Sequence, residues 1–193
     1  MTNIILASTS PRRQDLFNLL GIDYRQIPAK INEYIYPNEP PEAAVKRLAQ
    51  AKAEAVEKDV PRGIIIAADT IVVCNELILG KPADDDEAFK YLSLLSGQAH
   101  QVMTAICLKE ANTGYLDVQV EKTLVYFRHL TPEEIKAYIA TKEPFDKAGA
   151  YAIQGRGAIL VEKIAGCYFN VVGLPITRLY LMLKKQGVNL LGG

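Results

Sequence analysis

One carboxylate lies inside a run of residues that otherwise predicts a fully buried strand. Asp69 falls within residues 63–73, where nearly every other side chain is aliphatic or small. An ionised aspartate in apolar surroundings is costly unless a cation, a metal ion or hydrogen bonds compensate its charge. Two interpretations are therefore open: Asp69 is paired for structural reasons, or it serves the chemistry of a site.

A polar loop near the start of the chain has the composition of an anion-binding site. It follows a short apolar stretch, precedes a predicted helix, and reads Ser8-Thr9-Ser10-Pro11-Arg12-Arg13. Helix N-termini favour anions because free N–H groups and the helix dipole point at the ligand. Arginine adds bidentate donors for phosphate. The alternative is a capped helix with two solvated arginines.

Three more charged residues could contribute to such a site. Lys52 interrupts an apolar stripe on a predicted helix at residues 41–58, so its ammonium either reaches past the stripe to solvent or enters a site. Lys81 lies in a Gly-Lys-Pro turn and Glu33 in a polar, turn-like segment, and either alone would suit an ordinary surface position. Glu33 and Asp69, with water and phosphate oxygens, would suit Mg²⁺.

A glycine-rich segment near the end of the chain frames one amide side chain. Residues 146–157 place Gln154 among Gly149, Gly155 and Gly157. Small residues let the backbone approach a ligand closely, and an amide both donates and accepts hydrogen bonds. The alternative is a tight loop between two elements.

The elements that must position these residues alternate between strand and helix. Strands are predicted at residues 4–7, 23–28, 63–73, 99–110, 116–128 and 158–163, and residues 75–82 are predicted to be a loop. Helices are predicted from Ser10 to Gly21, at 41–58, from 84 to Gly97, from a Thr131 capping box to about 141, and from near Pro175. This order predicts an α/β fold with a mixed sheet, with a possible smaller lobe at about 84–145.

Composition limits the classes of protein that the chain could belong to. It has 193 residues, 49% of them hydrophobic, with 22 Lys+Arg balanced by 22 Asp+Glu. The zero net charge argues against a general nucleic-acid or membrane-surface binder, and no apolar run approaches the roughly 20 residues of a bilayer span. Cys74, Cys107 and Cys167 lack metal-type spacing, so we expect reduced thiols in a cytoplasmic protein.

Taken together, these motifs resemble the Maf family of nucleoside triphosphate pyrophosphatases. The matching segments are residues 8–13, 68–70, 80–82, 146–155 and 170–175, in the family's order along nearly the whole chain. The resemblance implies one ITPase-like α/β domain over residues 1–193, with a mixed central sheet flanked by helices and a substrate cleft between two lobes, often as a homodimer. It also implies a house-cleaning hydrolysis of nucleoside triphosphates to the monophosphate and pyrophosphate with a divalent metal cation, Mg²⁺ or Mn²⁺.

The resemblance further implies a role for each matching residue. The aspartate matching Asp69 is the family's proton acceptor, and Glu33 and Asp69 match positions associated with the metal. The combination at Arg12, Thr70 and Gln154 resembles the branch that prefers dTTP and UTP. The predicted set comprises catalytic Asp69, Lys52 and Lys81, and substrate-binding Ser8, Arg12, Arg13, Thr70 and Gln154.

Two other functions use the same residues differently. The family has a link to septum formation, so a non-catalytic nucleotide-sensing regulator of cell division would need the anion site but no carboxylate to position a nucleophile. A phosphomonoesterase would release orthophosphate from monophosphates. Metal-dependent release of pyrophosphate separates the predicted enzyme from both.

Overall fold

The computed structural model describes residues 3–191, which form two compact units. Unit 1 contains the chain up to Asp69, Thr104–Glu121 and the chain from Gly173 onward, and unit 2 contains Thr70–Met103 and Lys122–Val172. Within the described residues, seven strands form one sheet in the order β2-β1-β3-β5-β6-β7, with β4 paired to β3. Strands β1, β2 and β3 are parallel, whereas β4 pairs with β3 and β7 with β6 in antiparallel fashion. The predicted mixed α/β sheet is confirmed.

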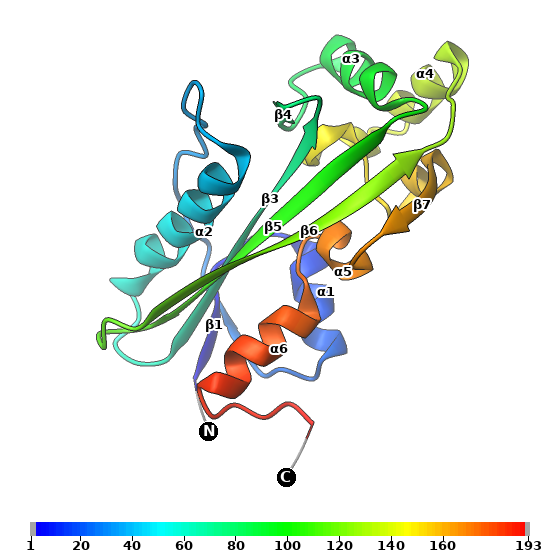
Figure 1. Ribbon diagram of the computed structural model, residues 1–193. Helices are drawn as coiled ribbons and strands as arrows, with labels where there is room; N and C mark the ends of the chain where they lie inside the picture. The colour runs from blue at the N-terminus through cyan, green and yellow to red at the C-terminus, as the bar shows by residue number, and fades with distance from the viewer. Residues whose placement is uncertain (1–2, 192–193) are drawn as a thin grey trace. The chain divides into compact units, whose positions relative to one another are not determined.

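Unit 1 begins with β1 (Ile4–Leu6), α1 (Pro11–Leu19), β2 (Arg25–Gln26) and α2 (Pro41–Glu57). The first part of β3 (Ile64–Cys74), the last part of β5 (Ala99–Glu110), the first part of β6 (Leu116–Phe127) and helix α6 (Ile176–Lys185) complete it. Helix α2 lies on one side of these strands, and α1 and α6 lie on the other (Figure 1). The predicted stripe of α2 is buried, including Val45, Leu48 and Val56, so apolar burial holds this helix on the sheet.

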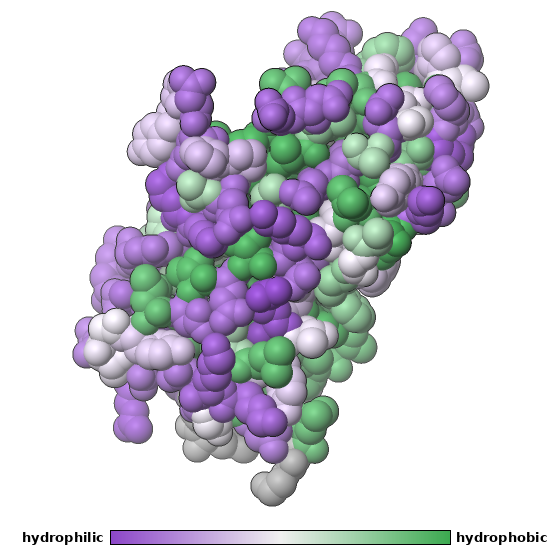
Figure 2. All heavy atoms as spheres, viewed as in Figure 1, coloured by the Kyte–Doolittle hydropathy of each residue, from purple (hydrophilic) through white to green (hydrophobic). Residues whose placement is uncertain are grey.

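Unit 2 contains β4 (Leu77–Leu79), α3 (Asp85–Leu95), α4 (Pro132–Ala140), β7 (Val161–Ala165) and α5 (Tyr168–Val172). Three short 3₁₀ segments follow α4, namely η1 (Glu143–Asp146), η2 (Ala148–Ala150) and η3 (Gly155–Leu160). Its core is apolar and includes Leu92, Leu95, Phe127, Ile135 and Leu160. Hydrophilic residues gather over α3 at the top of Figure 2. The first turn of this helix is acidic and contains Asp85, Asp86 and Glu87.

Local signals explain where several helices begin. The predicted capping box of α4 is present, because the Thr131 hydroxyl accepts from Glu134 N–H at 3.3 Å and the Glu134 carboxylate accepts from Thr131 N–H at 2.9 Å. Asp84 caps α3 by accepting from Glu87 N–H at 2.8 Å. The predicted start of α1 is confirmed, but Ser10 does not cap it with its side chain.

Two predicted segments are wrong in detail. Residues 75–82 are not only a loop, because β4 forms a hairpin with β3 through Asn75 and Glu76, both with positive φ. A strand of three residues has too little pattern to be recognised without its partner. The last strand begins at Val161 rather than at residue 158, because η3 occupies the residues up to Leu160. The short helix α5, only five residues long, was not predicted.

None of the helices within residues 3–191 combines the length and the apolar character that a bilayer span requires. Cys74 and Cys107 are buried free thiols and Cys167 is a half-buried one.

One histidine is buried in unit 2. His100 is 2% exposed, its Nε2 lies 2.8 Å from the Tyr151 hydroxyl, and its ring packs edge-on against Phe127. Burial lowers the pKa of His100 to about 4 from 6.5, because the imidazolium loses its hydration.

We therefore expect acid to destabilise the protein through His100. The depressed pKa means that its contribution is full above pH 6.5 and is lost as the pH falls toward 4, a loss of about 3 kcal/mol. Urea unfolding of His100→Gln from pH 7 to 4 should show a smaller decline in stability than the parent. His129→Gln, which changes an exposed histidine of the same unit, is the control variant. Identical pH dependence in His100→Gln and the parent would contradict this assignment.

Candidate active site

The predicted anion loop and Asp69 are brought together by two parallel strands. Leu6 in β1 aligns with Ile66 in β3, and Ala7 N–H donates to the Ile66 carbonyl at 2.8 Å. Ser8, two residues after the end of β1, therefore lies alongside the part of β3 that carries Asp69. Ligands of open parallel sheets bind beyond the carboxyl ends of the strands, which is where the loop after β1 lies.

Arg13 is held rigidly at the start of α1. Its Nε donates to the Gly173 carbonyl at 2.9 Å and one terminal nitrogen donates to Ser8 Oγ at 3.3 Å, in a buried position. Burial lowers the pKa of the Arg13 guanidinium and the charge of Arg12 lowers it further, while the charges of Asp69 and Glu33 oppose the decrease. The alternative of two solvated arginines is wrong for Arg13, although Arg12 is half-exposed.

Lys52 lies between two carboxylates. Its Nζ is 2.6 Å from Asp69 Oδ1 and 2.7 Å from Glu33 Oε1. The side chains of Lys52 and Asp69 are only 10% and 9% exposed, whereas that of Glu33 is 42% exposed. The ammonium of Lys52 therefore enters a charged cluster and does not extend past the apolar stripe to solvent.

The ion pair with Lys52 compensates the buried charge of Asp69 but does not isolate the charged cluster from solvent. One ammonium faces two carboxylates, and the more exposed carboxylate, Glu33, connects the group to water. A purely structural pair in a core would have no need of a second, half-solvated acid. The structure thus brings together five of the predicted residues within unit 1, namely Ser8, Arg13, Glu33, Lys52 and Asp69.

The remaining predicted residues are Arg12, Thr70, Lys81 and Gln154. Arg12 adjoins Arg13 in unit 1. Thr70 follows Asp69 in β3 and is half-buried, and Lys81 and Gln154 are exposed side chains of unit 2. Within unit 2 the Lys81 turn is joined to the glycine-rich segment, because Gly149 N–H donates to the Gly80 carbonyl at 3.0 Å.

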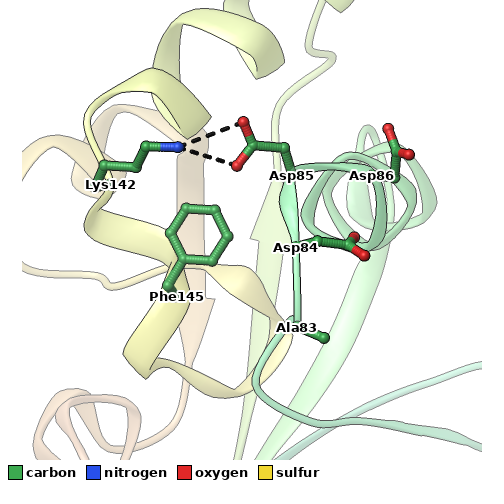
Figure 3. Close-up of a pocket in the computed structure, with 6 residues that line it drawn as sticks. All are labelled: Ala83, Asp84, Asp85, Asp86, Lys142 and Phe145. Atoms are coloured by element: carbon green, nitrogen blue, oxygen red, sulfur yellow. Dashed lines mark hydrogen bonds and ion pairs between the residues drawn. The ribbon is translucent and has the colours of Figure 1, made fainter.

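A pocket in unit 2 has the wrong charge for a triphosphate. It holds about 520 Å³ and is lined by Ala83, Asp84, Asp85, Asp86, Lys142 and Phe145. Figure 3 shows Lys142 pointing at Asp85, with Nζ 3.1 and 3.4 Å from its two carboxylate oxygens. Among the described residues that line this pocket, Lys142 is the one cation, and it is engaged by one of the three aspartates. None of these lining residues belongs to the predicted site.

Some residues that hold the site together were missed in the sequence. The carbonyl of Gly173 fixes Arg13, but a backbone acceptor so distant in the chain leaves no local signal. Glu143 and Tyr138 hold the segment that carries Gln154. Neither has a pattern that separates it from a surface glutamate or a core tyrosine.

The chain also resembles known proteins over nearly its whole length. Residues 3–186 match the family described as Maf-like protein. This chain belongs to the Maf family. A dTTP/UTP pyrophosphatase of Syntrophomonas wolfei is 54% identical over 96% of this chain and 98% of that protein.

Two other relatives align with this chain over similar shares of their length. A dTTP/UTP pyrophosphatase of Carboxydothermus hydrogenoformans is 50% identical over 95% of this chain and 98% of its own length, and one of Caldicellulosiruptor bescii is 47% identical over 100% and 99%. Among solved structures, the Staphylococcus aureus Ham1 protein gives a TM-score of 0.45 at 18% identity, covering 65% of this chain and 71% of that one.

Proposed function

We propose that this Maf protein hydrolyses nucleoside triphosphates, with dTTP and UTP preferred, to the nucleoside monophosphate and pyrophosphate. The full-length relatives named dTTP/UTP pyrophosphatases support this activity. The observation that carries the proposal is the cluster in which Lys52 contacts both Asp69 and Glu33, within the field of Arg13. It combines a carboxylate able to orient water with cations able to hold phosphates.

The chemical problem is electrostatic repulsion between an anionic substrate and an electron-rich nucleophile. Asp69 orients a water molecule toward the α-phosphorus and accepts its proton as the new P–O bond forms. The bond between the α-phosphorus and the bridging oxygen to the β-phosphate breaks, and pyrophosphate departs with that oxygen. Arg13, Lys52 and Lys81 hold the β- and γ-phosphates and stabilise the charge that develops on the leaving group.

The carboxylates of the cluster fit a divalent cation. Glu33 and Asp69 carry hard carboxylate oxygens, and one oxygen of each lies 2.6–2.7 Å from the same Lys52 ammonium. Mg²⁺ is commonly held by one or two carboxylates together with substrate phosphates and water. Within the described residues no cluster of three or more candidate ligands forms, so phosphate and water oxygens would complete the coordination. A bound Mg²⁺ or Mn²⁺ would neutralise phosphate charge.

Base selectivity is assigned to Gln154, Thr70 and Arg12. The amide of Gln154 can pair with the O4 and N3–H edge that uracil and thymine share and that cytosine presents differently. A site built to satisfy one hydrogen-bonding pattern rejects another because its own polar groups are left unpaired.

The test of the proposed function is a nucleotide panel with product analysis. The purified chain is incubated with dTTP, UTP, CTP, ATP and GTP, with Mg²⁺ or with EDTA, and nucleotide products, pyrophosphate and orthophosphate are quantified. We expect UMP or TMP with pyrophosphate, in metal-dependent fashion. UDP with orthophosphate as first products would contradict cleavage at the α-phosphorus. Nucleotide binding without turnover would instead favour the regulator.

We also propose that the whole chain acts as a single Maf-like domain in the cytoplasm, where the nucleotide pool is found, and that it forms a homodimer. The family resemblance supports these proposals. Size-exclusion chromatography with light scattering tests the oligomeric state.

A further inference from the structure

The segment that carries Gln154 is bound to one carboxylate. We call residues 152–157 the Gln154 loop. After Gln154, the N–H groups of Arg156 and Gly157 donate to Glu143 at 3.1 Å (Oε2) and 2.9 Å (Oε1). Glu143 belongs to η1 and is half-buried. Both of its oxygens are therefore engaged by the backbone on one side of Gln154.

A tyrosine holds the other side of the same loop. The Tyr138 hydroxyl donates to Glu143 Oε1 at 2.8 Å and accepts from Ala152 N–H at 3.3 Å. Burial and the bond to Glu143 raise the pKa of Tyr138, so the hydroxyl keeps its proton and acts as a donor at neutral pH. Tyr138 thus connects the start of the Gln154 loop to the acid that holds its end.

The glycines of the loop are explained by this arrangement. A Cβ on Gly157 would lie 2.6 Å from the Tyr138 hydroxyl and 2.3 Å from the Ala152 carbonyl. A Cβ on Gly155, where φ is +70°, would lie 2.8 Å from Glu143 Oε2. The sequence suggested that small residues allow close approach to a ligand, whereas these two allow close approach to Glu143 and Tyr138.

Electrostatics keep Glu143 in the state that the loop requires. Partial burial raises the pKa of Glu143, but the bonds from Gly157 N–H, Tyr138 and Arg156 N–H together lower it below its ordinary value. The carboxylate is therefore ionised at neutral pH and accepts on both oxygens. Lys147 Nζ donates to the Glu143 carbonyl at 2.7 Å, which holds the backbone of η1 at this residue.

We propose that Glu143 and Tyr138 are positioning residues for base selectivity: they clamp the Gln154 loop at both ends and so fix where the Gln154 amide meets the base. This inference rests on the proposed function, because it takes Gln154 as the residue that reads the base. Gln154 itself is exposed, so its direction depends on the backbone that carries it. A selective site requires its polar groups to be held within a fraction of an ångström.

The experiment compares Tyr138→Phe and Glu143→Gln with a matched control. Ser96→Ala is the control, because it removes another hydroxyl of the same unit, one that accepts from Leu130 N–H at 2.8 Å. Two readouts are needed: the ratio of kcat/KM for UTP over CTP, with kcat and KM resolved, and the amide exchange rates of Ala152, Arg156 and Gly157. Gln154→Ala is the reference for loss of base reading.

We expect both clamp variants to lower the UTP/CTP ratio about tenfold, mainly through a higher KM for UTP. Exchange of the three amides should accelerate in the same variants. Ser96→Ala should change neither readout. Unchanged amide exchange in Tyr138→Phe and Glu143→Gln would overturn the clamp, as would an unchanged ratio when Gln154→Ala lowers it.

The proposed function can fail separately. If Gln154→Ala keeps the parent's UTP/CTP ratio, Gln154 does not read the base, and the positioning role of Glu143 and Tyr138 is rejected with that assignment. If the ratio falls in Gln154→Ala but not in Tyr138→Phe or Glu143→Gln, only the clamp is rejected. If no triphosphate is hydrolysed, the ratio is replaced by UTP and CTP affinities from calorimetry. Affinities that respond to Gln154→Ala but not to the clamp variants then overturn the clamp.

Discussion

Replacing Asp69 with asparagine is expected to lower kcat for UTP roughly 10²- to 10⁴-fold, the range associated with loss of a general base. Asparagine has nearly the same shape, and its carbonyl oxygen can still accept the bond from Lys52 that Asp69 accepts at 2.6 Å. The change therefore removes a proton acceptor and a negative charge while keeping the local hydrogen bond. KM should change much less than kcat.

The measurement is steady-state pyrophosphate release, with binding of a non-hydrolysable UTP analogue followed by calorimetry. Glu57→Gln is the matched control, since Glu57 is another unit 1 carboxylate paired with a lysine, Lys109, at 3.3 Å. It should keep turnover near that of the parent. Turnover near the parent's in Asp69→Asn would leave the carboxylate with a structural role only.

The sequence predicted most of the helices because their signals are local. The stripe of α2, the capping box at Thr131 and the acidic start of α3 each lie within a few residues of the element they begin or bury. The hairpin at β4 was missed because its three residues acquire their meaning only by pairing with Val72–Cys74. A strand so short is defined by its neighbour.

The site was predicted as a set of residue types but not as a set of contacts. The interruption of the α2 stripe identified Lys52, and the apolar run identified Asp69, yet nothing in either pattern indicated that the two side chains meet. Their contact depends on how α2 packs on β3. The same limit applies to Glu143. Its carboxylate accepts hydrogen bonds from the N–H groups of Arg156 and Gly157, and no local pattern in the sequence predicts these contacts.

Replacing Lys52 with methionine is expected to impair both stability and turnover. The change leaves Asp69, whose side chain is 9% exposed, without the ammonium at 2.6 Å and next to the like charge of Glu33. Removing one partner of a buried ion pair costs about 3 kcal/mol of unfolding free energy. Loss of a cation that holds phosphates should lower kcat/KM about 100-fold. Lys109→Met, which removes the cation of the Glu57 pair, is the control.

A double variant separates the two effects. In Lys52→Met combined with Asp69→Asn, the buried carboxylate is gone, so most of the lost stability should return, because removing both partners of an ion pair is far less costly than removing one. Turnover should stay low, since both groups are proposed to act on the substrate. Urea unfolding and pyrophosphate release on the four proteins of this cycle give the two results independently. If turnover recovered together with stability, Lys52 and Asp69 would be a structural pair, and the carboxylate that activates water would have to be sought elsewhere in the chain.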